Sequence, residues 1–109
     1  MMENINPDKL RKLIVSGKKM LLIDVREPYE FKEGSISGAK NLALSELETA
    51  VCLSKKDFLE KYGFELSKNV SIVVYCRSGG RSARACQYLD SLGYTTLNLE
   101  GGILNFQSD

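Results

Sequence analysis

A cysteine stands between a strand-like run and a helix-like run in the second half of the chain. Residues 70–75 read VSIVVY, a short apolar run that predicts a buried strand. Residues 82–89 read SARACQYL and place Ala85 and Leu89 on one helical stripe. A strand followed closely by a helix is typical of an α/β fold, in which the binding crevice lies beyond the carboxyl ends of the strands. The pattern therefore predicts that Cys76 lies in such a crevice.

The connection between the two runs consists of residue types that handle anions. It reads Cys76, Arg77, Ser78, Gly79, Gly80 and Arg81. The glycines allow the backbone to curl around a bound group, and the first amides of the following helix have no intrahelical partner. The arginines add permanent positive charge. These features favour a nucleophilic thiolate at Cys76 over the alternative of a buried, purely structural cysteine.

Size and composition are those of an ordinary globular protein. The length of 109 residues predicts one domain spanning residues 1–109. Fifteen basic residues against fourteen acidic ones give no one-sided field, so neither nucleic acid nor a membrane surface is expected as a partner. The longest apolar runs are too short to span a bilayer. The N-terminus has no targeting pattern, and a cytoplasmic location is expected.

The cysteine and histidine content excludes several kinds of site. Three cysteines without a CxxC pair indicate neither a disulfide framework nor a zinc centre. The absence of histidine excludes a Cys-His dyad and histidine-based metal sites, so neither a metal nor a cofactor is predicted. Cys86 borders the apolar stripe of its helix and is expected to pack there. Cys52 follows a capped helix and is expected to be partly exposed.

Strand and helix patterns alternate along the whole chain. Helices are predicted at 7–16, 27–33, 45–51, 55–62 and 82–92 and after Gly102, and strands at 20–25, 39–43, 70–75 and 95–99. This alternation predicts a single α/β domain with a mainly parallel central sheet flanked by helices.

Three helix starts carry a capping signal. Asn6 precedes a proline at the first helical position, and Ser54 precedes the helix over 55–62. Ser45 and Glu48 fit a capping box that would open the helix over 45–51.

Five motifs in order resemble those of single-domain rhodaneses, the thiosulfate sulfurtransferases. They are DVREPYEF at 24–31, GSISGAKN at 34–41, CRSGGR at 76–81, LGY at 92–94 and EGG at 100–102. The resemblance runs from about residue 5 to the end of the chain and implies a three-layer rhodanese-like fold. The segment from residue 45 to 62 also resembles the short thiosulfate:glutathione sulfurtransferase subgroup.

Two motifs depart from the family pattern. Ser35 and Ser37 stand where the family commonly has histidine and proline. Phe106 is the nearest aromatic residue where a tryptophan usually follows the last two glycines. Both positions are interpreted as architectural, and the loop that contains Cys76 is unaffected.

The resemblance implies a mechanism that suits the chemistry of the loop. Cys76 would take the outer sulfur of thiosulfate as a persulfide and pass it to cyanide or to a thiol such as glutathione. Backbone amides of residues 77–81 would stabilise the anionic sulfur. Arg77 and Arg81 would hold the sulfonate group of the donor.

Two alternatives to this function remain open. A dual-specificity cysteine phosphatase or an arsenate reductase would have one more residue between the cysteine and the arginine than the four that separate Cys76 from Arg81. A persulfide relay or interaction module would deliver the sulfur to a protein partner instead. The carboxylates of Asp24 and Glu30, with Arg26, are interpreted as holding the fold rather than as acid–base groups. The oligomeric state stays open.

Overall fold

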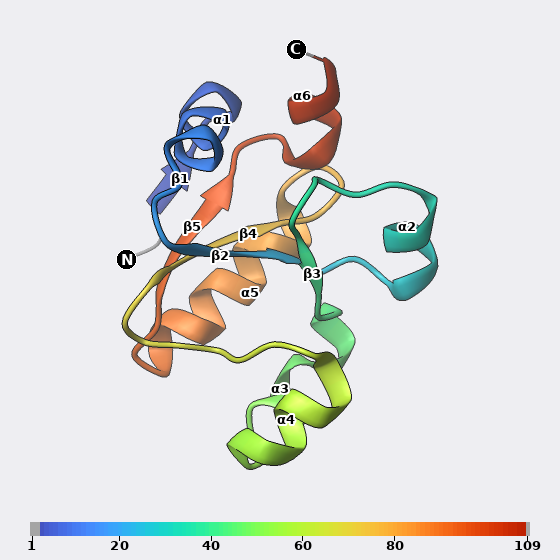
Figure 1. The fold of residues 1–109 in the computed structure, drawn as a ribbon. Helices are drawn as coiled ribbons and strands as arrows, with labels where there is room; N and C mark the ends of the chain where they lie inside the picture. The colour runs from blue at the N-terminus through green and yellow to red at the C-terminus, as the bar shows by residue number, and fades with distance from the viewer. Residues whose placement is uncertain (1–2, 109) are drawn as a thin grey trace.

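Five parallel strands form the centre of the fold (Figure 1). The structure is a computed structural model, and it describes residues 3–108. The strands are β1 (Glu3–Ile5), β2 (Met20–Asp24), β3 (Lys40–Asn41), β4 (Ser71–Tyr75) and β5 (Thr95–Leu99). Their order across the sheet is β1-β5-β4-β2-β3. The central strand β4 therefore has a neighbour on each side, and the carboxyl end of β4 lies in the middle of the sheet edge.

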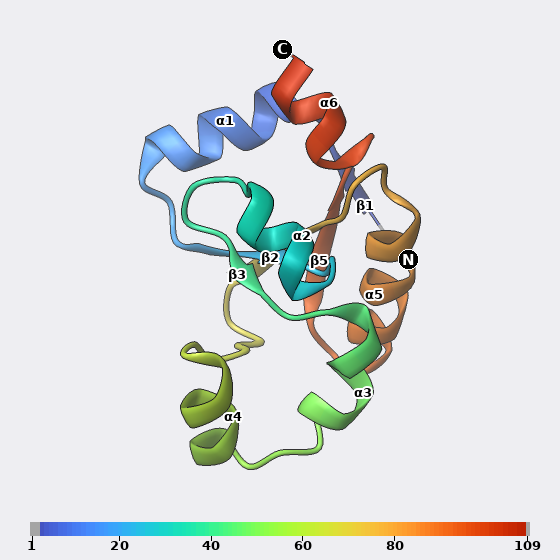
Figure 2. The same cartoon turned by 90° about the vertical axis from the view of Figure 1, so that its right-hand side faces the viewer.

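Helices cover both faces of this sheet, as predicted. They are α1 (Pro7–Ser16), α2 (Pro28–Glu33), the 3-10 helix η1 (Leu44–Glu46), α3 (Leu47–Ala50), α4 (Lys55–Tyr62), α5 (Gly80–Ser91) and α6 (Gly102–Ser108). In Figures 1 and 2, α1 and α6 lie on one side of the sheet, and α3, α4 and α5 lie on the other. The predicted three-layer α/β fold is thus confirmed.

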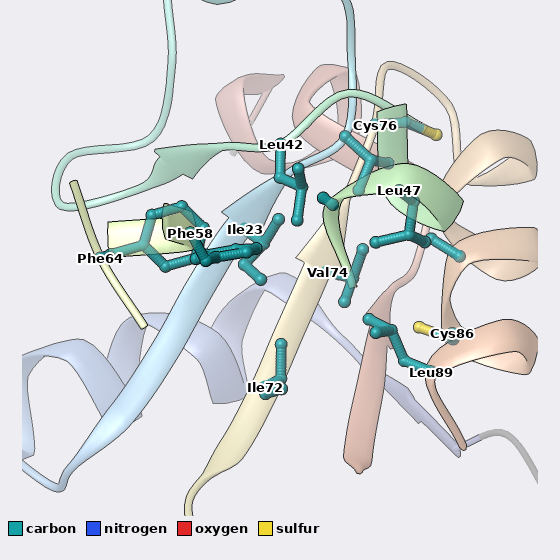
Figure 3. Close-up of a cluster of buried hydrophobic side chains, with 13 residues drawn as sticks. Ile23, Leu42, Leu47, Phe58, Phe64, Ile72, Val74, Cys76, Cys86 and Leu89 are labelled. Atoms are coloured by element: carbon teal, nitrogen blue, oxygen red, sulfur yellow. The ribbon is translucent and has the colours of Figure 1, made fainter. Parts of the chain in front are cut away.

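The alternation of side chains along β4 explains how one strand serves both layers. Successive side chains of a strand point to opposite faces. Ile72 and Val74 join the apolar cluster on the α5 side, whereas Val73 and Tyr75 join the cluster against α1 and α6. All four are fully buried. Cys76 continues the alternation and lies with the α5-side cluster, near Leu47 and Leu42 in Figure 3.

None of the helices described between residues 3 and 108 has the length and apolar character needed to cross a membrane. The predicted caps at Asn6 and Ser54 are both formed. Asn6 Oδ1 accepts a hydrogen bond from the Lys9 amide at 2.8 Å, and Ser54 Oγ accepts one from the Asp57 amide at 3.1 Å.

The predicted capping box at Ser45 and Glu48 is wrong. Ser45 lies inside η1, no side chain caps α3, and the Ser45 hydroxyl donates instead to Glu27 Oε2 at 3.1 Å. Leu44 and Leu47 both pack against the α5-side core. Residues three apart share a face in a 3-10 turn, so burial of this pair favours η1 over an uninterrupted α-helix.

Two strand predictions also need correction. The strand expected over residues 39–43 is reduced to Lys40–Asn41. The Ala39 amide belongs to a turn, where it donates to the Ile36 carbonyl at 3.0 Å, and the last backbone bond to β2 strand residues is that of the Leu42 amide to the Asp24 carbonyl at 2.9 Å. The short edge strand β1 was not predicted, since only Ile5 among its three residues is buried and the segment has no strand-like pattern.

Candidate active site

Cys76 lies directly after β4, in the turn that leads into α5. Its side chain is buried, and the amide of Gly79 donates to its Sγ at 3.1 Å. Gly79 has a φ of 113°, a left-handed conformation that favours glycine, and it is the residue before the first turn of α5. The turn therefore curls back so that a backbone N–H faces the sulfur, as the sequence predicted.

Hydrogen bonds and burial act in opposite directions on the Cys76 thiol. Burial would raise its pKa, because it disfavours the charged form. Hydrogen bonds from the Ser82 hydroxyl and from the amides of Ser82, Gly79 and Ser78 outweigh this effect and lower the pKa below its ordinary value. The site therefore favours the thiolate, which is the nucleophilic form of cysteine.

Ser82 is a site residue that the sequence reasoning did not identify. It is fully buried in the first turn of α5, and its Oγ lies 3.4 Å from Cys76 Sγ. The same hydroxyl is within hydrogen-bond reach of the Gly79 carbonyl, at 3.1 Å, and of Asn98 Oδ1 on β5. A hydroxyl has one proton, so donation to the thiolate requires that it leave the other two acceptors. The available sequence signal was a hydroxyl residue immediately after Arg81.

The start of α6 holds the other side of the turn. The amide of Ile103 donates to the Cys76 carbonyl at 2.9 Å, and the amide of Leu104 donates to the Arg77 carbonyl at 3.2 Å. Gly102 has a φ of 65°, and a Cβ at this position would stand 2.4 Å from the Arg77 carbonyl oxygen. The close approach therefore requires glycine, and it directs the carbonyls of the turn toward α6.

The two arginines of the turn have different environments. Arg81 forms a bidentate ion pair with Glu30 of α2, with Nη1–Oε1 at 2.7 Å and Nη2–Oε2 at 3.1 Å. The hydrogen bond from Arg81 lowers the pKa of Glu30 to about 2. Arg77 is exposed, as are Ser78 and Gly80. The structure thus brings all six predicted residues to one turn, and it adds a carboxylate partner for Arg81.

Asp24 and Arg26 form a separate, buried pair after β2. Arg26 Nη2 donates to Asp24 Oδ2 at 2.7 Å, and it also donates to the carbonyl of Gly34. Both residues are buried. The pair ties the end of β2 to the segment after α2, which agrees with the structural role expected for these residues.

The other cysteines lie apart from this turn. Cys52 is exposed and Cys86 is buried within α5, and all three cysteines are free thiols. Burial raises the pKa of Cys86 to about 11, so this thiol is protonated at neutral pH. Within residues 3–108 there is no group of three or more histidine, cysteine, aspartate or glutamate side chains that could hold a metal ion.

Residues 6–109 match the family model described as the rhodanese-like domain. The chain belongs to the rhodanese family. Curated relatives include a putative mitochondrial thiosulfate sulfurtransferase of Schizosaccharomyces pombe, 46% identical over 81% of this chain and 63% of that longer protein. The human thiosulfate:glutathione sulfurtransferase is 39% identical over 80% of this chain and 76% of its own length.

The solved structures agree with this assignment. The human single-domain sulfurtransferase TSTD1 superposes with a TM-score of 0.91 at 33% identity, covering 97% of this chain and 96% of that one. The family recognised in the sequence motifs and the rhodanese-like fold are both confirmed. This protein is accordingly a rhodanese-family sulfurtransferase.

Proposed function

We propose that this protein moves the sulfane sulfur of thiosulfate, through a persulfide on Cys76, to a small thiol or to cyanide. The observation that carries the proposal is the position of the buried Cys76 sulfur, 3.1 Å from the Gly79 amide and 3.4 Å from the Ser82 hydroxyl. These donors lower the pKa of Cys76 despite its burial. Relatives named as thiosulfate sulfurtransferases support the choice of donor, and the relative named for glutathione supports a thiol acceptor.

In the first step the Cys76 thiolate attacks the outer sulfur of thiosulfate. A new S–S bond forms to Cys76 while the S–S bond of thiosulfate breaks, and its electron pair leaves with sulfite. The product is an anionic persulfide on Cys76, so the total charge is unchanged. The amide of Gly79 and the hydroxyl of Ser82 lie where they can donate to sulfur that carries this charge.

In the second step the acceptor attacks the outer sulfur of the Cys76 persulfide. A thiolate acceptor gives a small-molecule persulfide, and cyanide gives thiocyanate. The Cys76 thiolate is the leaving group, and the same hydrogen bonds stabilise it as they do in the free enzyme. Both steps are nucleophilic displacements at sulfur. The second step regenerates the Cys76 thiolate, so the reaction needs no group beyond the protein, the donor and the acceptor.

The spacing of the turn argues against the phosphatase alternative. Four residues separate Cys76 from Arg81, which is one fewer than in the cysteine phosphatases that share this architecture. In addition, both terminal nitrogens of the Arg81 guanidinium already donate to the Glu30 carboxylate, so they are not directed at a phosphoryl group in the turn. A smaller cradle of amides suits a single sulfur atom better than a tetrahedral phosphoryl group.

Steady-state kinetics with thiosulfate and either cyanide or glutathione test the proposal. The persulfide route predicts ping-pong kinetics, because sulfite leaves before the acceptor reacts. Cys76→Ser is expected to abolish turnover, whereas Cys52→Ser and Cys86→Ser are expected to retain most of it. Turnover by Cys76→Ser, or its loss in folded Cys86→Ser, would show that sulfur travels by another residue.

A further inference from the structure

A pocket of about 700 Å³ lies beside the Cys76 turn, between α5 and the segment formed by η1 and α3. Figure 2 shows α3 near α5. The pocket has an apolar floor of Val25, Leu44 and Leu47. Arg81 belongs both to the turn and to the wall of this pocket, so the pocket begins where the Cys76 turn ends. We call it the flanking pocket.

The two walls of the flanking pocket carry opposite charges. The α5 wall presents Arg84 and Tyr88 one turn apart, and the facing wall presents Glu48. Neither the Arg84 nor the Glu48 side chain forms a hydrogen bond or ion pair with any residue in the described part of the chain. The pocket therefore offers a free cation and a free anion above an apolar floor.

The remaining charges of the pocket are already engaged. Arg81 is held by Glu30, and the Glu27 carboxylate accepts a hydrogen bond from Ser45. These contacts occupy the Arg81 guanidinium and one oxygen of the Glu27 carboxylate. A ligand that enters the pocket finds its unsatisfied charged partners farther along, at Arg84 and Glu48.

We propose that the flanking pocket binds the sulfur acceptor, and that the acceptor is a small thiol carrying both a carboxylate and an ammonium group. The carboxylate of the acceptor would pair with Arg84, and its ammonium group would pair with Glu48. Both of these side chains lack a partner among the described residues of the free protein. The volume lies within the range of pockets that bind small molecules. This inference rests on the proposed function, because it names the acceptor class of the same reaction.

Bound in this way, the acceptor carries out the second step of the proposed reaction. Its thiolate attacks the outer sulfur of the Cys76 persulfide, an S–S bond forms to the acceptor, and the Cys76 thiolate leaves. The pocket holds the acceptor beside Arg81, and this proximity raises the rate of attack on the persulfide.

Four acceptors separate the two charges experimentally. Cysteine carries both groups, N-acetylcysteine only the carboxylate, cysteamine only the ammonium, and 2-mercaptoethanol neither. Protein loaded with thiosulfate is mixed with each acceptor, and the rate of persulfide loss is measured at several concentrations. The quantity compared is the kcat/KM of each charged thiol divided by that of 2-mercaptoethanol. This ratio is insensitive to a change in the reactivity of Cys76 itself, because such a change affects all four acceptors equally.

Crossed losses are expected from Arg84→Gln and Glu48→Gln. Arg84→Gln is expected to lower the relative kcat/KM about three- to tenfold for cysteine and N-acetylcysteine but not for cysteamine. Glu48→Gln is expected to lower it for cysteine and cysteamine but not for N-acetylcysteine. Lys56→Gln and Glu60→Gln remove the same charges from the exposed surface of α4 and are the matched controls. Equal responses of all four acceptors to both variants would overturn the inference.

Direct binding of S-methylglutathione, which carries both charges and cannot accept sulfur, tests the pocket without the reaction. Amide NMR shifts are expected at residues 44–49 and 84–88, and Arg84→Gln is expected to weaken the binding. Shifts elsewhere, or no binding, would overturn the inference and favour a protein acceptor. Failure of thiosulfate to load Cys76 would instead refute the proposed function, and the binding measurement would still decide the pocket.

Discussion

At Cys76, burial and hydrogen bonding have opposite effects on the pKa of the thiol. Full burial of a thiol raises its pKa, as it does at Cys86. At Cys76 the donors of the turn reverse that outcome. Each of these buried cysteines has one side-chain hydrogen bond that lowers its pKa, from Ser82 at Cys76 and from Thr96 at Cys86. The backbone amides of the glycine turn act on Cys76 alone of the two, and they account for the opposite outcome.

Replacement of Ser82 by alanine is expected to raise the pKa of Cys76. The variant removes the strongest of the hydrogen bonds that favour the thiolate. A hydrogen bond to a charged group contributes about 1.5–3 kcal/mol, which corresponds to about one to two pKa units. The thiolate is the reactive form, so a higher pKa means slower alkylation at neutral pH.

The measurement is the rate of Cys76 alkylation as a function of pH. Ser91→Ala, which removes an exposed hydroxyl from the same helix, is the control and should leave the profile unchanged. If Ser82→Ala and the wild type show the same midpoint, the backbone amides alone set the thiol pKa.

Replacement of Arg77 by alanine is expected to act mainly on donor binding. Arg77 is exposed at the turn, and the sulfonate of thiosulfate stays charged until sulfite departs. An interaction present in both ground and transition state raises KM when it is lost and changes kcat less. A loss of about ten- to hundredfold in kcat/KM for thiosulfate is expected.

Steady-state kinetics across thiosulfate concentrations check this expectation, with the exposed Lys12→Ala on α1 as a charge control. Wild-type KM and kcat in Arg77→Ala would mean that the donor is held without this side chain, by the backbone amides of the turn.

Replacement of Glu30 by glutamine is expected to lower stability in a pH-dependent manner. The folded pKa of Glu30 is depressed from 4.5 to about 2 by Arg81, so its stabilising effect is present above pH 4.5 and is lost as the pH falls toward 2. The difference in Tm between wild type and Glu30→Gln should therefore be constant near neutral pH and shrink below pH 4.5. Thermal unfolding at a series of pH values measures it, and a difference that does not shrink would assign the stabilisation to another group.

At the scale of elements, α6 acts as a support for the Cys76 turn. Its first amides bind the carbonyls of Cys76 and Arg77, and Gly102 allows the two segments to meet. The terminal helix therefore shapes a turn that precedes it by more than twenty residues in the sequence.

Gly102→Ala is expected to destabilise the fold and to slow persulfide formation. Two effects destabilise the alanine variant. The backbone at this position is left-handed, and the added Cβ would stand 2.4 Å from the Arg77 carbonyl oxygen. Gly17→Ala is the matched control, because Gly17 has a similar φ of 72° with no atom within 4 Å. The control should lose about 1–2 kcal/mol in free energy of unfolding, and Gly102→Ala clearly more. Equal losses from denaturant unfolding, with unchanged persulfide formation, would show that α6 does not shape the turn.

Local patterns predicted β4, α5 and the Cys76 turn because each is encoded within a few neighbouring residues. The buried run, the paired glycines and the helical stripe are contiguous. The Ser82–Asn98 contact joins residues 16 apart, and it depends on the pairing of β4 with β5. No local pattern reports which side chain of one strand faces the hydroxyl of a preceding helix.

The same limit explains the role of Glu30. It is separated from Arg81 by 51 residues, and the two meet only because α2 follows β2, the neighbour of β4. Sequence motifs placed both residues in one family pattern and gave Glu30 a structural role. They could not show that this role is exerted on an arginine of the Cys76 turn.

At the scale of the whole molecule, the parallel sheet gathers the functional parts at one edge. The carboxyl ends of β2, β4 and β5 lead respectively to the segments that hold Glu30, Cys76 and Gly102. The α5-side layer then adds the flanking pocket between α5 and α3. The Cys76 turn and the flanking pocket thus share Arg81. This arrangement suits the proposed mechanism, in which sulfur is received and passed on at the same atom.

Intact-mass spectrometry after incubation with thiosulfate tests the central step most directly. The persulfide mechanism predicts the mass of one added sulfur in the wild type and in Cys52→Ser and Cys86→Ser, its absence in Cys76→Ser, and its removal by an added thiol or by cyanide. An unchanged wild-type mass, or an added sulfur in Cys76→Ser, would contradict sulfur transfer through Cys76.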